Sequence, residues 1–136
     1  MSLRFTKFDA VAHRAKATHN IDVANAIAKL PDDARDWQVT ALFYAAVHLI
    51  QAYFAAIGSS YPQTHQDRDH AIIQDRRLRK IYNDYRELKQ AAVASRYLCW
   101  PVNDFDVSEA KRHLAMVQAF IDDALATSEP PVHRDS

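Results

Sequence analysis

Four polar residues in the middle of the chain are of the types that bind phosphate. His48 lies in a long apolar stretch, His65 and Arg68 follow it, and Arg96 comes later beside Tyr97. Residues three apart lie on one side of a helix, so His65 and Arg68 are expected to face one site. Imidazole groups move protons and guanidinium groups stabilise phosphate charge. We therefore take His48, His65, Arg68 and Arg96 as candidates for binding an anion such as a nucleotide phosphate.

The two histidines also fit structural roles. A histidine on an apolar helix commonly forms a hydrogen bond inside the core, which would account for His48. A histidine near the start of a helix commonly caps it, which would account for His65. Both interpretations stay open at the level of sequence.

A second group of residues is basic and lies just after this region. Its members are Arg76, Arg77, Arg79, Lys80, Arg86 and Lys89. A stripe of this kind can follow a nucleic-acid backbone, with affinity that falls steeply with salt, and Arg76, Arg79, Lys80 and Arg86 are the candidates. The alternative is a solvated helix face, which the formal net charge of zero favours.

No metal site and no cofactor site are predicted. Cys99 is the only cysteine, which excludes a zinc site built from cysteines, and beside Trp100 it is expected to be a small core residue. Di-iron bundles need Glu-x-x-His pairs, and Glu109 and His113 are one residue too far apart. Phosphate-binding loops need several glycines, and Gly58 is the only one.

The candidate residues must be positioned by helices. A chain with one glycine lacks the tight turns that join strands, so the fold class is all-α. Four helical segments are expected, over about 8–30, 34–57, 67–97 and 106–125, which together imply an up-and-down four-helix bundle. The third is too long to be straight and is expected to be kinked or split. The last is expected to begin with Asp106 as its cap.

The second helical segment is apolar nearly all round. Such a helix lies either in the centre of a bundle or against a partner subunit, and the second possibility favours a homodimer. The aromatic residues of the chain are expected in the core and the dimer interface, and they include Trp37, Phe43, Tyr44, Tyr53, Phe54 and Tyr85.

One domain over residues 1–127 is expected, since 136 residues with 49% hydrophobic content can form a single core. Residues 128–136 carry two prolines and are expected to form a disordered tail. No apolar run reaches the roughly 18 residues of a membrane-spanning helix, so no membrane association is predicted. The first eight residues lack the apolar stretch of a signal peptide, which favours the cytoplasm.

Four motifs, taken in order, resemble a bacterial branch of the HEPN superfamily, a group of helical domains named for nucleotide binding in higher eukaryotes and prokaryotes. They are WQVTALFYAAVH at 37–48, PQTHQDR at 62–68, YREL at 85–88 and SRY at 95–97. The resemblance covers about Asp9 to Leu125. It implies a four-helix bundle, a frequent homodimer and roles around RNA or nucleotides. Many members are RNA-cleaving toxins, and others are paired with small nucleotidyltransferases.

Catalytic members of that superfamily carry Arg, four to six further residues and then His, on a late helix, and need no metal. Here the one such spacing, Arg14 to His19, lies on the first helix. The late helix offers only Arg112 and His113, which are adjacent and expected to point in different directions.

Three hypotheses follow. The first is a homodimeric HEPN-like module that binds RNA, a nucleotide or a partner protein without demonstrable catalysis. The second is a metal-independent endoribonuclease of toxin type. The third is a structural subunit that pairs with a nucleotidyltransferase or an antitoxin.

Overall fold

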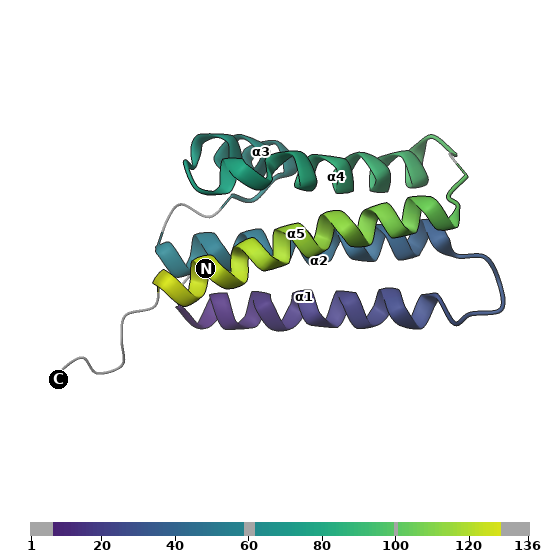
Figure 1. The fold of residues 1–136 in the computed structure, drawn as a ribbon, viewed down its shortest axis with the longest axis horizontal. Coiled ribbons are helices and arrows are strands. Elements are labelled where there is room, and N and C mark those ends of the chain that lie inside the picture. The colour runs from purple at the N-terminus through teal and green to yellow at the C-terminus, as the bar shows by residue number, and fades with distance from the viewer. Residues whose placement is uncertain (1–6, 59–61, 100, 129–136) are drawn as a thin grey trace.

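A computed structural model describes residues 7–58, 62–99 and 101–128, and helices dominate this part of the chain (Figure 1). Its elements are α1 (Lys7–Ile27), α2 (Arg35–Ile57), α3 (His65–Gln74), the 3₁₀-helix η1 (Leu78–Ile81), α4 (Tyr82–Tyr97) and α5 (Asp104–Ser128). No strand occurs among the described residues. The all-α prediction is confirmed.

The centre of the molecule is α2. Figure 1 shows α1 on one side of α2 and α5, and α3 and α4 on the other. By length and composition α2 could span a membrane, but 78% of its apolar window is buried inside the protein, as in the core helix of a soluble domain. Since α1, α4 and α5 all contact α2, its apolar faces are covered within one chain. Of the two positions predicted for this helix, the structure shows the central one.

The predicted third helix is split at Asp75, which ends α3. The Asp75 carboxylate accepts hydrogen bonds from the backbone N–H groups of Arg77 and Leu78, both at 2.9 Å, and from the Tyr53 hydroxyl at 3.1 Å. A side chain that bonds the following N–H groups competes with the helix for them, so the helix stops here. Burial and the charge of Asp75 raise the pKa of Tyr53 to about 12.

Two predicted helix boundaries are wrong. The first helix ends at Ile27 rather than at Leu30, and a turn follows it. The last begins at Asp104 rather than at Asp106, because Asn103 and Asp106 cap it reciprocally. Asn103 Oδ1 accepts from the Asp106 N–H at 2.9 Å, and Asp106 Oδ2 accepts from the Asn103 N–H at 3.0 Å.

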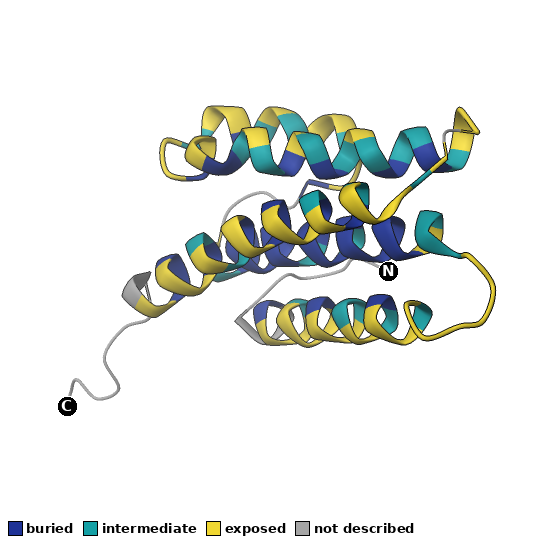
Figure 2. Cartoon of the chain, turned by 45° about the vertical axis from the view of Figure 1, so that its right-hand side comes forward, coloured by how far each residue is buried: buried dark blue, intermediate teal, exposed yellow. Residues whose placement is uncertain are grey.

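Most of the aromatic residues predicted for the core or a dimer interface are buried, and Tyr44 is half-buried (Figure 2). Phe43, Tyr53, Phe54 and Tyr85 are buried. Trp37 is 57% exposed, because it lies in the first turn of α2 at the edge of the fold. Cys99 is also exposed, with a positive φ of 52°, in the connection between α4 and α5. The expected core position of Cys99 is therefore wrong.

The last helix, α5, ends at Ser128, which is the first residue of the predicted tail. The expected tail, apart from Ser128 at the end of α5, lies outside the described residues.

Gly58 follows α2 in the left-handed conformation, with φ of 70°, and its N–H bonds to the carbonyl of Ala55. The single glycine of the chain thus stands where a helix end requires a positive φ.

Candidate functional site

The start of α3 lies against the middle of α2. Thr64 caps α3 by accepting a hydrogen bond from the Asp67 N–H at 2.9 Å, so the capping role considered for His65 belongs to Thr64. The His65 ring instead faces α2, with its centroid 5.5 Å from that of Phe43 and 6.4 Å from that of Tyr44. This arrangement leaves the His65 nitrogens available to neighbours on α3 and α4.

Arg68 is the most unusual side chain of the described fold. It is only 5% exposed, and its Nη1 lies 2.9 Å from His65 Nδ1. Its Nε has no hydrogen-bond partner, and no carboxylate of the described residues forms an ion pair with it. A buried charge without a counter-charge destabilises a fold, so this arrangement needs an explanation.

Arg96 approaches from the far end of α4. Its guanidinium carbon lies 5.9 Å from the ring centre of Tyr44 on α2 and 5.1 Å from that of Tyr97. Its Nη1 is buried and has no hydrogen-bond partner among the described residues. The charge of Arg96 also acts on His65. Arg96 of α4 therefore lies beside α2.

His48 forms a pair that the sequence did not reveal. Its Nδ1 lies 2.9 Å from Nδ1 of His13 on α1, and the two rings stack with centroids 5.2 Å apart. A hydrogen bond between two Nδ1 atoms needs one donor and one acceptor, so it holds a single Nδ1 proton. Burial, together with the charges of His13, Lys16 and Arg68, lowers the pKa of His48 to about 4. His48 is therefore neutral at pH 7.

The spacing of small residues along α1 indicates that His13 lies on the face of the helix that packs on the core. Ala10, Ala17 and Ala24 recur every seven residues and are buried, which marks the face of α1 that packs on the core. His13 lies between the first two of them on that face. His13 is not among the candidates predicted from the sequence, because its partner His48 lies 35 residues further along the chain.

Several ionisable groups near Arg68 act on one another. Burial lowers the pKa of His65, the charges of Arg68 and Lys89 lower it further, and Asp69 opposes them. Lys89 forms an ion pair with Asp69 at 2.5 Å. The Tyr85 hydroxyl is buried; burial raises its pKa to about 12, and the neighbouring Arg68 acts in the opposite direction. We refer to the candidate set His48, His65, Arg68 and Arg96 as the anion site.

The two other arginine–histidine pairs considered from the sequence lie away from the anion site. Arg14 forms an ion pair with Asp122 of α5 at 2.8 Å, and His19 is exposed, so the structure does not bring these two residues into the anion site. Arg112 and His113 do meet, with Nη2 and Nε2 3.4 Å apart, and the expectation that they point in different directions is wrong. The other ring nitrogen of His113, Nδ1, lies 2.8 Å from Oδ1 of Asp84 on α4.

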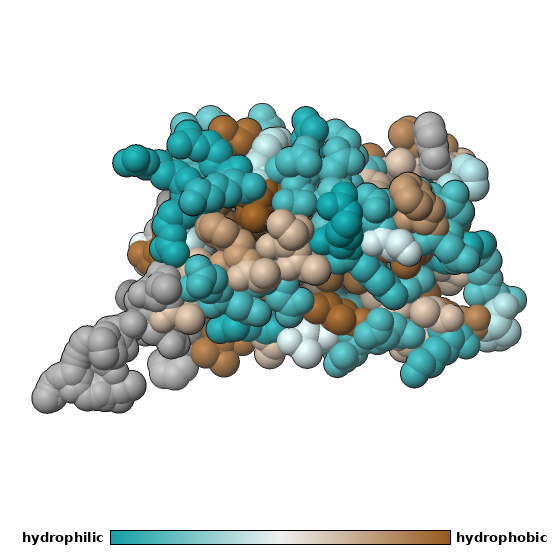
Figure 3. All heavy atoms as spheres, in the orientation of Figure 1, coloured by the Kyte–Doolittle hydropathy of each residue, from teal (hydrophilic) through white to brown (hydrophobic). Residues whose placement is uncertain are grey.

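The four basic candidates for nucleic-acid contact form an exposed group of their own. Arg76, Arg79, Lys80 and Arg86 are all exposed, on η1 and its flanks. Figure 3 shows hydrophilic side chains over this end of the molecule. Arg86 lies 3.7 Å from Glu87 and 3.2 Å from Asn83, so it is the most engaged of the four.

Within the described residues, no three His, Cys, Asp or Glu side chains gather as a metal site would require. No family model, no curated protein and no solved structure matches the chain. The anion site therefore has to be interpreted from its own geometry.

Proposed function

We propose that the protein is a HEPN-like module that binds RNA or a nucleotide through a phosphate at the anion site, without catalysis. The observation that carries the proposal is the buried Arg68, whose Nε has no partner and whose charge has no described counter-ion. Arg96 repeats the pattern nearby with its buried Nη1. A phosphate would supply both the negative charge and the acceptor oxygens that these groups lack.

The position of the motifs supports the same proposal. The segment 37–48 lies in α2, the segment 62–68 leads into α3, and the segments 85–88 and 95–97 lie in α4. Three of the segments supply the residues of the anion site, and Tyr85 of the remaining one contacts Phe43 of the first. In this proposal α1, α2, α4 and α5 are the four-helix bundle, and α3 with η1 is the detached first part of its third helix.

The proposed module is a cytoplasmic homodimer. The dimer depends on the resemblance alone, because the apolar faces of α2 that first suggested it are covered within one chain. Light scattering at micromolar concentration tests it, and a monomer there would remove the dimer from the proposal while leaving the anion site in place.

Phosphate binding is tested by calorimetry with inorganic phosphate and adenosine monophosphate, and by anisotropy with a short single-stranded RNA. Arg68→Met and Arg96→Met are expected to weaken binding about ten-fold or more, as for a lost charge-assisted contact. Arg112→Met is the matched control, since Arg112 is an exposed arginine on α5. Equal affinity in all three variants, or no binding by the wild type, would contradict the proposal.

A metal-independent endoribonuclease is the second candidate, and the His13–His48 pair is the observation that favours it. A neutral imidazole next to a second imidazole can take a proton from a ribose hydroxyl, and Arg68 lies near enough to influence His48. This candidate predicts RNA cleavage that persists in EDTA and is lost in His48→Ala. Intact RNA after incubation with the wild type would exclude it.

A further inference from the structure

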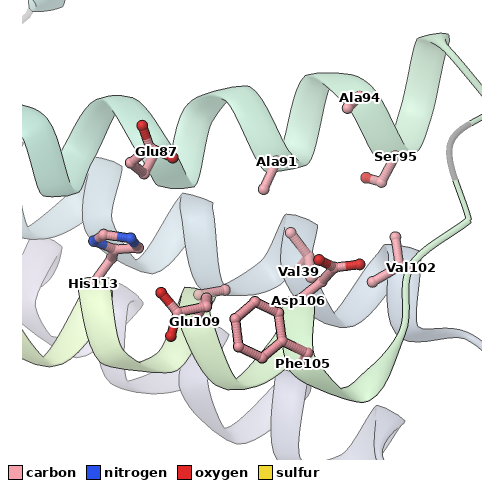
Figure 4. A pocket seen from close by; sticks show the side chains of 11 residues that line it. Val39, Glu87, Ala91, Ala94, Ser95, Val102, Phe105, Asp106, Glu109 and His113 are labelled. Atoms are coloured by element: carbon pink, nitrogen blue, oxygen red, sulfur yellow. The ribbon is translucent and has the colours of Figure 1, made fainter.

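A pocket of about 330 Å³ lies between α4 and α5, and it shares no residue with the anion site (Figure 4). The space exists because small residues occupy the facing positions, with Ala91 and Ala94 on α4 and Ala110 on α5. Val39 of α2, which is 1% exposed, also lines it. The pocket therefore has apolar walls and a volume within the range of small-ligand sites.

The polar groups of this pocket carry negative charge. Glu87, Asp106 and Glu109 line it, and no lysine or arginine does. Just outside the lining, the exposed Arg112 pairs with Glu109 at 2.8 Å and lowers the pKa of that carboxyl. Arg86 lies 3.7 Å from Glu87. Among the described residues, Asp106 accepts only the backbone N–H of Asn103, so the three carboxylates outnumber the two arginines beside them. The fourth ionisable lining group, His113, is paired with Asp84 at 2.8 Å.

Carboxylates beside apolar walls favour an organic cation over a bare metal ion. A bare metal ion needs several ligands close together, and no three such side chains of the described residues gather in this way. A cation that also fills apolar space would satisfy both the carboxylates and the alanine walls. We propose that the α4–α5 pocket binds a primary ammonium carried on a short aliphatic chain.

An ammonium of this kind has two sources, a free amine and a lysine side chain of a partner protein. The proposal stands apart from the anion site, because the two regions share no lining residue. Failure of phosphate binding would leave it intact, and the reverse holds as well.

The test is calorimetry at low salt with n-butylamine and cadaverine, with 1-butanol as the neutral probe of the same shape. The wild type is expected to bind the amines at about millimolar affinity, which suits a ligand of so few atoms, and the alcohol at least about five-fold more weakly. An N-acetylated lysine amide tests the second source, and binding of it alone would assign the pocket to a partner protein.

Two variants locate the binding. Glu109→Gln removes one rim charge at a half-exposed position that leaves the core untouched, and it is expected to weaken amine binding about five-fold. Ala94→Leu fills the pocket and is expected to weaken binding about ten-fold or more. Ala119→Leu, at an exposed position of α5, is the matched control. Unchanged amine affinity in Glu109→Gln and Ala94→Leu, equal binding of the alcohol, or no binding of any probe would overturn the proposal.

Discussion

The two sides of α4 differ in the sign of the charged groups that lie against them. Toward α2 and α3, the guanidinium groups of Arg68 and Arg96 have buried nitrogens without partners. Toward α5, the pocket is lined by three carboxylates and by no lysine or arginine. The formal net charge of zero is a sum of 17 basic and 17 acidic residues over the whole sequence, and it does not describe either region.

The two regions also differ in how they are built. The anion site has large aromatic neighbours, Phe43, Tyr44 and Tyr85. Arg68 is buried, and His48, His65 and Arg96 are half-buried. The α4–α5 pocket has alanines at its walls and its carboxylates at an open rim. We infer that changes at the anion site act on stability and binding together, whereas changes at the pocket rim act mainly on binding.

The largest effect is expected in the core of α4, the helix that lies between the two regions. Leu88 is fully buried on α4, so Leu88→Ala leaves a cavity in the core and is expected to lower the free energy of unfolding by about 2–5 kcal/mol. Urea unfolding measures it. Gln90→Ala, at an exposed position of the same helix, is expected to stay within about 0.5 kcal/mol, and a similar cost for both variants would contradict the expectation.

A change at the break between α3 and α4 is expected to separate the two regions. Asp75→Ala removes the acceptor of two backbone N–H groups and of the Tyr53 hydroxyl, at a cost of about 1–3 kcal/mol. Because α3 carries His65 and Arg68, phosphate binding should weaken while amine binding stays unchanged. Parallel loss of both affinities would mean that the two regions are not independent. Asp32→Ala, at an exposed position before α2, is the control.

As the pH is lowered, the free energy of unfolding is expected to fall first through the titration of His48. The pKa of His48 is lowered in the folded state from 6.5 to about 4, so the unfolded chain takes up the proton first as pH falls. The stability that neutral His48 contributes is complete above about pH 6.5 and is lost between pH 6.5 and about 4. Unfolding at a series of pH values should show this slope, and His48→Gln should flatten it.

Two comparisons sharpen that experiment. His19→Gln, at an exposed position of α1, should keep the wild-type slope. Glu109 of the α4–α5 pocket should contribute little over the same range, because Arg112 lowers the pKa of its carboxyl and so moves its titration to lower pH. An unchanged slope in His48→Gln would place the titration elsewhere.

The smallest effect on stability is expected at the exposed basic group. Arg79→Gln together with Lys80→Gln should change the free energy of unfolding by less than about 0.5 kcal/mol. If the group follows a phosphate backbone, RNA affinity at low salt should fall, and its slope against the logarithm of salt should become shallower by roughly two. Unchanged affinity and slope would show that these residues form only a solvated face.

Much of the arrangement could be predicted from local sequence. One glycine predicted an all-helical chain, and the length of the third segment predicted its split. The spacing of His65 and Arg68 placed them together. The spacing of buried alanines indicates the face of α1 that carries His13, but the partners of the missed residues depend on long-range packing, which local patterns do not contain. His13 meets His48 only through the register of α1 on α2, and Asp84 meets His113 only through that of α4 on α5.

Exposure was also harder to predict than helix formation. Trp37 and Cys99 are apolar in type and have apolar neighbours in sequence, yet both lie where helices end, and their side chains face solvent. The α5 boundary shows the same limit, since Asn103 and Asp106 both suit a cap and only the backbone geometry decides between them.

The exposed Cys99 offers a practical means of observing both regions. It is the only thiol in the chain, so a maleimide dye or a nitroxide would attach at one position without any engineered substitution. Its neighbours in sequence include Arg96 before it and Val102, which lines the α4–α5 pocket, after it. A single spectroscopic label would therefore report on phosphate and amine titrations in the same sample.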